Sequence, residues 1–322
     1  MFLNSTKLML TNTMVIGVTM TICSNNWYSM WMGLEISLLS FIPLMQTSKA
    51  LSSESMIKYY IVQSVASTLM LLSVSVMLIG VSMMNLLLTM SMLIKIGASP
   101  FHNWLMMIIE TMNFYEIWIL LTLMKMPPLS ILFQINIKLV TVSVILGMIL
   151  GSIMCLNQTS IRKTLGYSSI FNISLVLSII SNFNFMIIFM LIYSFMLLMF
   201  IFILMKFKIN FINQMVFNEV NLMMKINLWI NMLSMGGFPP LMGFLMKLIV
   251  IQFMIFNNEY FLLTIMMFTS IVVMLFYMRL MFTSLMFLST SMKFVKFNLN
   301  SSFNLIINLI VFPMIVSLTL VY

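Results

Sequence analysis

The sequence contains few charged residues, a single histidine, two cysteines and no aspartate. Only 7% of its 322 residues are charged and 62% are hydrophobic, whereas a water-soluble domain carries about 25% charged residues. This composition excludes a soluble globular fold. The single histidine, His102, cannot build a bis-histidine haem or a zinc site from this chain alone. Because no GxGxxG, GKS or GKT motif is present either, we expect no cofactor and no metal ion in this chain.

The few charges carry a formal net charge of +9. The basic residues are spread along the whole chain and do not gather on one polar face, so nucleic acid is not an expected partner. Cys23 and Cys155 are interpreted as apolar side chains near helix ends. The 42 methionines occur in every apolar segment, which favours the compositional drift of an AT-rich, organellar genome over a copper site.

Long apolar runs are present instead, and they predict an all-α polytopic membrane protein. One helical crossing needs roughly 20 apolar residues, and these runs do not alternate as the strands of a transmembrane barrel would. Polar breaks divide the chain into eleven predicted transmembrane helices, at residues 8–24, 27–46, 56–80, 83–109, 113–134, 137–156, 167–182, 184–207, 222–256, 260–288 and 303–321.

Two of the predicted helices, the fourth and the ninth, carry glycine and proline in mid-span. The fourth contains the run GASP at residues 97–100, and the ninth contains GGFPP at residues 236–240. Proline lacks a backbone N–H and clashes with the preceding turn, so we expect both helices to be interrupted. Freed backbone groups at membrane depth are tolerated only where protein or water satisfies them, so each interruption predicts an enclosed polar cavity.

Each interrupted helix is the fourth in a set of five. This spacing favours two inverted five-helix repeats, an antiporter-like arrangement, with 1–134 as the first half, 135–290 as the second and 291–322 as a C-terminal helix. The odd-numbered loops hold only Lys138. The N-terminus and the even-numbered loops hold Lys7, Lys49, Lys58, Arg162, Lys163, Lys206, Lys208, Lys225, Lys293 and Lys296. The positive-inside rule then places the N-terminus inside and the C-terminus outside.

Four ionisable residues lie well inside predicted helices: Glu35, Lys95, Lys125 and Lys247. A charge at mid-membrane costs roughly 2.5–3.5 kcal/mol, so such residues usually face a polar interior and serve function. A lysine whose charge is opposed by burial and favoured by a neighbouring carboxylate can take up and release a proton. The four residues are therefore predicted to form a proton relay. The alternative is that the lysines snorkel, or that a Glu–Lys pair only locks helices together.

His102 follows the proline of the first interruption. It is interpreted either as a proton carrier between Lys95 and water or as a structural histidine with satisfied hydrogen bonds. Glu110 and Glu116 flank the next loop and are interpreted as ordinary solvated charges, with a proton entry point as the alternative. The basic end of the loop at 158–163 is interpreted as topological or lipid-binding.

Several segments resemble a known family in the same order along the chain. They are 31–35 (WMGLE), 39–43 (LSFIP), 58–60 (KYY) with Gln63, 95–102 (KIGASPFH), 156–163 (LNQTSIRK), 167–170 (YSSI), 234–247 (SMGGFPPLMGFLMK) and 276–279 (FYMR). The series resembles the chain 2 family of mitochondrial NADH-ubiquinone oxidoreductase, in its AT-biased, insect-like form. The sequence departs from the family pattern after Lys125, where Met126, Pro127 and Pro128 follow.

The resemblance implies an antiporter-like, proton-pumping subunit in the membrane arm of respiratory complex I. It implies a multi-pass protein of the mitochondrial inner membrane, with its N-terminus on the matrix side and its C-terminus on the intermembrane side. On the matching positions, Glu35 and Lys95 would form the pair of the first half. Lys125 would bridge toward the second half, which Lys247 would serve.

The resemblance also implies the partners and the cofactors. The expected partners are the other membrane-arm subunits of complex I and phospholipids, with cardiolipin first among them. FMN, iron–sulfur clusters and ubiquinone would sit elsewhere in the complex, with no redox chemistry in this chain. Two other functions stay open, a stand-alone cation/proton antiporter and a structural scaffold of the membrane arm. A sodium site would need more intramembrane carboxylates than Glu35, the only deep one found.

Overall fold

The computed structural model describes residues 5–47, 50–78, 84–135, 140–217 and 222–286. The predicted helix at 303–321, the predicted C-terminal segment 291–322 and the loop residue Lys138 lie outside these ranges. The described residues are mostly helical and form no strand beyond one isolated bridge between Ser160 and Phe211. A mostly helical fold therefore agrees with the prediction from the apolar runs.

The helices follow one another closely along the chain. They are α1 (Ser5–Cys23), α2 (Trp27–Leu44), α3 (Ala50–Leu78), α4 (Met84–Ile96), α5 (Asn103–Ile109), α6 (Phe114–Leu121), the 3₁₀ turn η1 (Leu123–Lys125), α7 (Met126–Ile135), α8 (Val140–Leu156), α9 (Ile161–Ser178), α10 (Phe183–Phe207), α11 (Ile212–Phe217), α12 (Leu222–Gly236), α13 (Met242–Phe256) and α14 (Tyr260–Met286).

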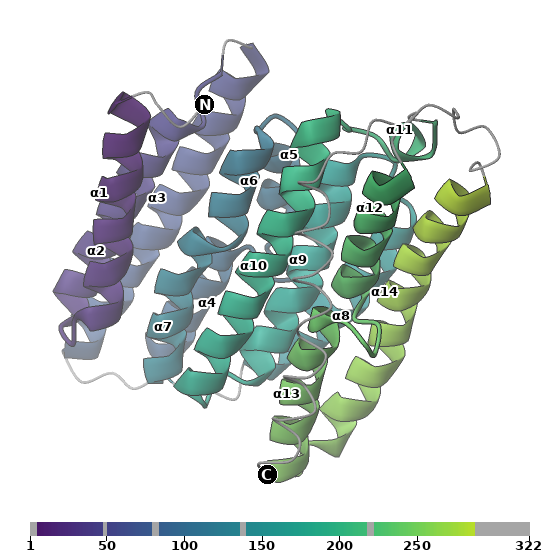
Figure 1. Cartoon of the computed structure of the whole chain (residues 1–322). Coiled ribbons are helices and arrows are strands. Elements are labelled where there is room, and N and C mark those ends of the chain that lie inside the picture. Colours follow the sequence, from purple (N-terminus) through teal and green to yellow (C-terminus); the bar gives the residue numbers. More distant parts are fainter. Residues whose placement is uncertain (1–4, 48–49, 79–83, 136–139, 218–221, 287–322) are drawn as a thin grey trace. The chain divides into compact units, whose positions relative to one another are not determined.

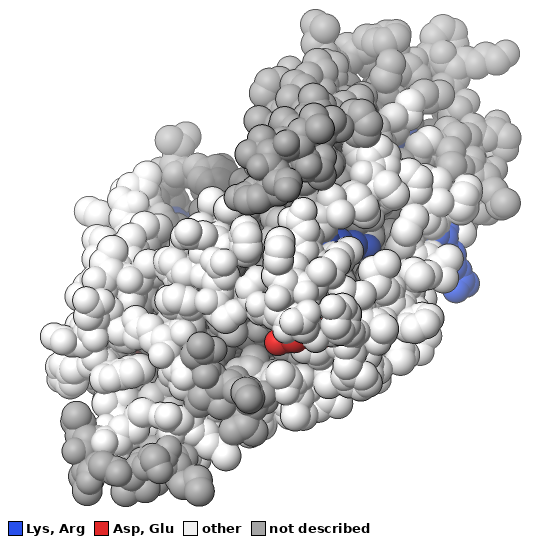
Figure 2. All heavy atoms as spheres, turned by 90° about the horizontal axis from the view of Figure 1, so that it is seen from below, with Lys and Arg blue, Asp and Glu red and all other residues white. Residues whose placement is uncertain are grey.

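Several of these helices are long and apolar enough to cross a membrane. By length and composition, five described segments qualify: Ser5–Cys23, Ala50–Met77, Phe114–Ile135, Phe183–Phe207 and Tyr260–Thr283. Shorter apolar helices occupy Asn85–Ile96, Val140–Leu156 and Met242–Phe256. Figure 2 shows one face on which uncharged residues predominate, with only isolated basic and acidic side chains. Such a surface suits a membrane interior better than water.

The described chain divides into two compact units. The first comprises residues within Met1–Leu150 and Ser169–Met186, and the second those within Gly151–Ser168 and Ile187–Tyr322. In the first unit α1 packs on α2, and α3 packs on both α2 and α4, as the neighbouring ribbons show (Figure 1). A Cβ on Gly17 would lie 2.8 Å from the backbone nitrogen of Ser37. Small residues of this kind let transmembrane helices approach closely.

Both predicted interruptions are confirmed. α4 ends at Ile96 and α5 begins at Asn103, while α12 ends at Gly236 and α13 begins at Met242. A third interruption was not predicted. The segment expected as one helix at 113–134 is divided into α6, η1 and α7. Pro127 and Pro128 occupy the first turn of α7, where a missing backbone N–H costs nothing, but they cannot continue a helix from α6.

Candidate functional site

The first interruption is built around Gly97, which follows the last residue of α4. Its φ of 72° lies in the left-handed region that favours glycine. The N–H of Gly97 donates to the carbonyl of Ile94, and the N–H of Ala98 donates to the carbonyl of Leu93, both at 3.1 Å. This pair of bonds is the Schellman motif that commonly ends a helix.

The second interruption repeats this turn at Gly237. Its φ is 74°. Its N–H donates to the carbonyl of Ser234 at 3.0 Å, and the N–H of Phe238 donates to the carbonyl of Leu233 at 3.1 Å. The two runs GASP and GFPP, at 97–100 and 237–240, therefore begin with the same helix-ending turn in two different units, although the Ser99–Pro100 bond of the first run is cis.

The carbonyl groups near the end of α4 are satisfied by neutral side chains. The indole nitrogen of Trp104, on α5, donates to the carbonyl of Ile94 at 3.1 Å. The amide nitrogen of Gln63, on α3, donates to the carbonyl of Lys95 at 3.2 Å. These two bonds hold the broken end of α4 without using a charged group.

At the end of α12 a lysine satisfies a different carbonyl, that of Gly236, which directly precedes the left-handed glycine. The ammonium nitrogen of Lys247, on α13, donates to the carbonyl of Gly236 at 2.7 Å. Lys247 is only 9% exposed. A Cβ on Gly237 would overlap the Lys247 side chain, and one on Gly243 would overlap the carbonyl of Ser234. The glycines around this turn thus make room for the lysine and for the return of the chain.

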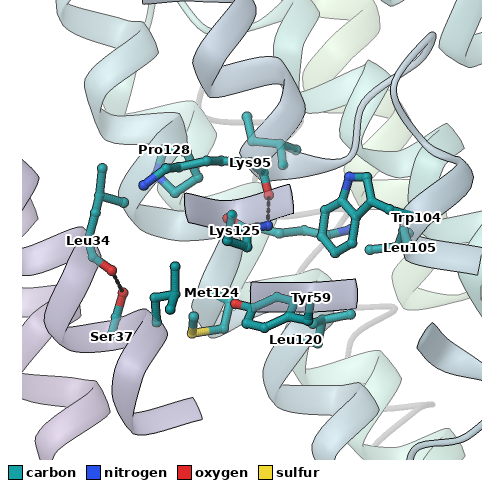
Figure 3. Close-up of a pocket in the computed structure, with 13 residues that line it drawn as sticks. Leu34, Ser37, Tyr59, Lys95, Trp104, Leu105, Leu120, Met124, Lys125 and Pro128 are labelled. Atoms are coloured by element: carbon teal, nitrogen blue, oxygen red, sulfur yellow. Dashed lines mark hydrogen bonds between the residues drawn. The ribbon is translucent and has the colours of Figure 1, made fainter. Parts of the chain in front are cut away.

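Lys95 and Lys125 line one cavity in the first unit (Figure 3). Their exposed fractions are 7% and 2%, so both ammonium groups lie inside the protein. About 20 Å³ of the cavity is open to the centres of water molecules, and a cavity needs about 10–15 Å³ to hold one. The other lining residues are Leu34, Ser37, Leu38, Tyr59, Gln63, Ile96, Trp104, Leu105, Leu120, Met124 and Pro128. The cavity is therefore large enough to hold a water molecule, and both lysines line it.

Glu35 lies on α2 next to Leu34, which lines the cavity. Its Oε1 atom is buried and has no hydrogen-bond partner among the described residues. The carboxylate is near enough to interact electrostatically with Lys95. Within the described ranges, however, no ion pair of 4.0 Å or less joins Glu35 and Lys95. The two groups are neighbours without direct contact, an arrangement that a bridging water would suit.

Lys125 has a polar neighbour of its own. Its ammonium nitrogen donates to the hydroxyl oxygen of Ser169, on α9, at 3.3 Å. Both side chains are buried in the first unit. Lys125 is also the last residue of η1, so the unpredicted interruption of the fifth segment places this lysine at a helix end.

His102 lies in the turn between α4 and α5 and is half-buried. Its Nδ1 is 3.2 Å from the carbonyl oxygen of Pro100, and the residue does not line the cavity of Lys95. Glu110 is exposed, as expected. Glu116 is only 3% exposed, because its carboxylate accepts from the backbone and side-chain nitrogens of Asn113 in a capping box. The interpretation of Glu116 as a solvated charge was therefore wrong.

Several buried polar residues were not predicted as part of the site. Gln63, Trp104 and Ser169 act through contacts with residues far along the chain, and a single sequence carries no signal for such pairs. Lys225, counted above as a loop charge, is a buried residue of α12. The same helix buries Asn227, Asn231 and Ser234. Their i, i+4, i+7 spacing was a visible signal for one polar helix face.

No group of three or more histidine, cysteine, aspartate or glutamate side chains that could hold a metal ion occurs in the described part of the chain. The amines of Lys95 and Lys125 and the hydroxyls of Ser37 and Tyr59 line the cavity, and the Glu35 carboxylate lies near Lys95. Groups of these kinds can bind, hold and pass protons.

Comparison with known proteins places the chain in a family. A family model described as NADH:quinone oxidoreductase/Mrp antiporter, transmembrane, matches residues 24–80 and 78–273. The chain is 35% identical over 328 residues to NADH-ubiquinone oxidoreductase chain 2 of Anopheles gambiae, covering 96% of each sequence.

Solved structures agree on the fold. A chain of respiratory complex I from Thermus thermophilus with bound aureothin matches with a TM-score of 0.79 at 18% identity, over 87% of this chain and 71% of that one. A chain of the Mrp complex from Dietzia sp. matches with a TM-score of 0.76 at 16% identity, over 84% of this chain and 59% of that one. The chain, as its resemblance predicted, belongs to the NADH:quinone oxidoreductase/Mrp antiporter family of transmembrane proteins.

Proposed function

We propose that this chain is an antiporter-like core subunit of the membrane arm of mitochondrial complex I, in the inner mitochondrial membrane. It contributes to proton translocation that is coupled to electron transfer from NADH to ubiquinone. The observation that carries the proposal is the buried cavity shared by Lys95 and Lys125. Burying two cationic groups in one small cavity costs free energy. Where membrane proteins bury such groups, the groups usually serve function.

The cavity supports a simple relay. Lys95 and Lys125 line the same cavity, and the negatively charged carboxylate of Glu35 lies near the Lys95 ammonium group and attracts it. When that negative charge is neutralised, the Lys95 ammonium loses its support, and its proton passes through water in the cavity to the amine of Lys125. Because the two ammonium groups repel each other, one proton is shared between them at lower cost than two. His102 and Lys247 complete the proposed set of proton carriers, with Lys247 serving its own unit.

The same proposal covers the finer topology. Eleven transmembrane helices would form two inverted five-helix repeats, 1–134 and 135–290, followed by a C-terminal helix at 291–322. The N-terminus would lie on the matrix side and the C-terminus on the intermembrane side. Two observations support the repeats. Both interruptions use the same Schellman turn, and each divides the fourth predicted helix of its set.

The proposed partners and cofactors follow from the relatives. The other membrane-arm subunits of complex I would surround the chain, with phospholipids such as cardiolipin at its basic loops. Electron transfer would take place at FMN, iron–sulfur clusters and ubiquinone held outside this chain. Electron transfer would then take place outside this chain, and its own residues would contribute proton movement.

The test is the number of protons translocated per electron by the intact complex in vesicles. We expect Lys95→Met to lower this ratio, or to slow coupled electron transfer about tenfold or more, as removal of a proton-transfer group does. Lys58→Met is the matched control, because Lys58 is an exposed lysine that pairs only with Glu54 on its own helix. A Lys95→Met complex that assembles and translocates protons normally would favour the scaffold function instead.

A second function, cation/proton antiport, is favoured by the fold that the chain shares with a subunit of the Mrp complex. It is distinguished by a sodium gradient imposed on vesicles without NADH. A sodium-driven pH change that Lys95→Met abolishes would support antiport, whereas the absence of any change would support redox-driven pumping.

A further inference from the structure

The bond from Gln63 identifies a buried residue that the relay does not itself include. Gln63 lies on α3 and donates from its Nε2 to the carbonyl oxygen of Lys95, 32 positions along the chain. The end of α4 frees that carbonyl, and no other described group donates to it. Lys95 is therefore held through its backbone by a neutral side chain, while its own side chain lines the cavity.

The second unit shows what occupies such a carbonyl when the donor is charged. The turn at Gly237 frees the carbonyl of Gly236, one position nearer its glycine than Lys95 is to Gly97, and there the ammonium group of Lys247 is the donor. A carbonyl at membrane depth is costly when no donor reaches it. In the second unit, the ammonium group of Lys247, which would carry a proton, satisfies the carbonyl. In the first unit, Gln63 satisfies the carbonyl, and the ammonium group of Lys95 is not needed for it.

We propose that Gln63 is a positioning residue of the relay, because it satisfies the Lys95 carbonyl and so leaves the ammonium groups of Lys95 and Lys125 available for proton exchange. The inference rests on the proposed function. Without the Gln63 amide, an ammonium group lining the cavity turns to the unsatisfied carbonyl, as Lys247 does in its own unit. That proton is then held more tightly and exchanges less readily, although the helices stay packed.

The first test is Gln63→Met in the intact complex, since methionine has similar length and volume but donates no hydrogen bond. We expect normal assembly and a loss of protons translocated per electron. Gln158→Met is the matched control, because Gln158 also donates to a backbone carbonyl, that of Met154, but at an exposed position in a loop. The control should keep the wild-type ratio.

The second test is Gln63→Glu, which makes the donor depend on pH. A protonated carboxyl group donates to the Lys95 carbonyl as the amide does, but a carboxylate only accepts. We expect proton translocation near the wild-type level at the lowest pH the complex tolerates, and a decline as pH rises that the wild type lacks. A Gln63→Glu variant whose pH profile equals that of the wild type would overturn the inference.

The outcomes separate this inference from the proposed function. If Lys95→Met lowers the proton ratio but Gln63→Met and Gln63→Glu leave it unchanged at every pH, Gln63 is only a packing residue. If Lys95→Met itself has no effect in an assembled complex, the proposed function fails. Should Gln63→Met fail to assemble, the pH profile of Gln63→Glu still decides the question.

Discussion

The two interrupted helices end in the same turn but use their charged side chains differently. At Gly97, the neutral side chains of Gln63 and Trp104 donate to the carbonyls of Lys95 and Ile94, and Lys95 lines a cavity. At Gly237, the ammonium group of Lys247 satisfies the carbonyl itself. The same helix-ending turn therefore does not imply the same role for the lysines near it.

The lysines also stand at different places relative to each turn. Lys95 precedes its left-handed glycine by two residues, whereas Lys247 follows Gly237 by ten. Hydrogen bonds to charged groups contribute about 1.5–3 kcal/mol, against roughly 1 kcal/mol between neutral groups. We infer that the Lys247 ammonium group both stabilises the fold, through its hydrogen bond, and supplies a buried positive charge. The Lys95 ammonium group mainly supplies a buried positive charge.

The largest expected effect on stability is at the start of the helix that follows each turn, α5 or α13. Gly243 and Asn103 each follow their left-handed glycine by six residues, but only Gly243 presses against the backbone, at the Ser234 carbonyl. We expect Gly243→Ala to destabilise the protein by the roughly 1–3 kcal/mol that overpacking costs, or by more. Asn103→Ala, at an exposed position, should be nearly neutral. Thermal denaturation of the purified complex measures both, and equal melting temperatures would contradict the difference.

The second prediction compares the two lysines directly. Lys247→Met leaves the buried Gly236 carbonyl without its donor, so stability should fall by about 1–3 kcal/mol. Lys95→Met leaves no carbonyl without its donor, because Gln63 still satisfies the Lys95 carbonyl, so its melting temperature should fall less than that of Lys247→Met. Both variants should impair proton translocation. A larger loss of stability in Lys95→Met would mean that the lysines do not differ in this way.

A smaller effect is expected at Trp104. Trp104→Phe keeps the ring but removes the donor to Ile94, whose carbonyl still accepts from the N–H of Gly97. The cost should be about 0.5–1.5 kcal/mol, with little change in protons per electron. If Trp104→Phe impaired translocation as strongly as Gln63→Met, the claim that the donor to the Lys95 carbonyl matters more for the relay than the donor to the Ile94 carbonyl would be wrong.

The smallest effect is expected outside both turns. Lys58 and Glu54 form an exposed i, i+4 pair on α3, with side chains 46% and 59% exposed. Such pairs contribute about 0–1 kcal/mol. Lys58→Ala should therefore shift neither the melting temperature nor the proton ratio measurably, and the same scan that detects the Lys247→Met change provides the comparison.

Local sequence signals predicted the features that depend on local chemistry. Glycine followed by proline foretold both interruptions, because a left-handed residue and a missing N–H are properties of the residues themselves. Apolar runs around single charges identified Lys95 and Lys125 as buried. Pro127 and Pro128 carried the same kind of signal for the third interruption, as did the Asn113 and Glu116 spacing for a capping box.

Contacts between distant segments were beyond a single sequence. The Lys125–Ser169 pair spans 44 positions, and it depends on how α9 packs within the first unit. The amide of Gln63 reaches Lys95 only because α3 lies against α4. The division between neutral and charged donors at the two turns is equally a result of packing, which is why the sequence predicted two similar turns but not their different use.

The most direct test of the central claim is a map of the intact complex that resolves water around Lys95. The account predicts ordered water in the cavity shared with Lys125, within hydrogen-bonding distance of the Lys95 ammonium and continuing toward Glu35 Oε1. A cavity filled by apolar side chains or lipid, with Lys95 and Lys125 separated by water-free packing, would contradict it.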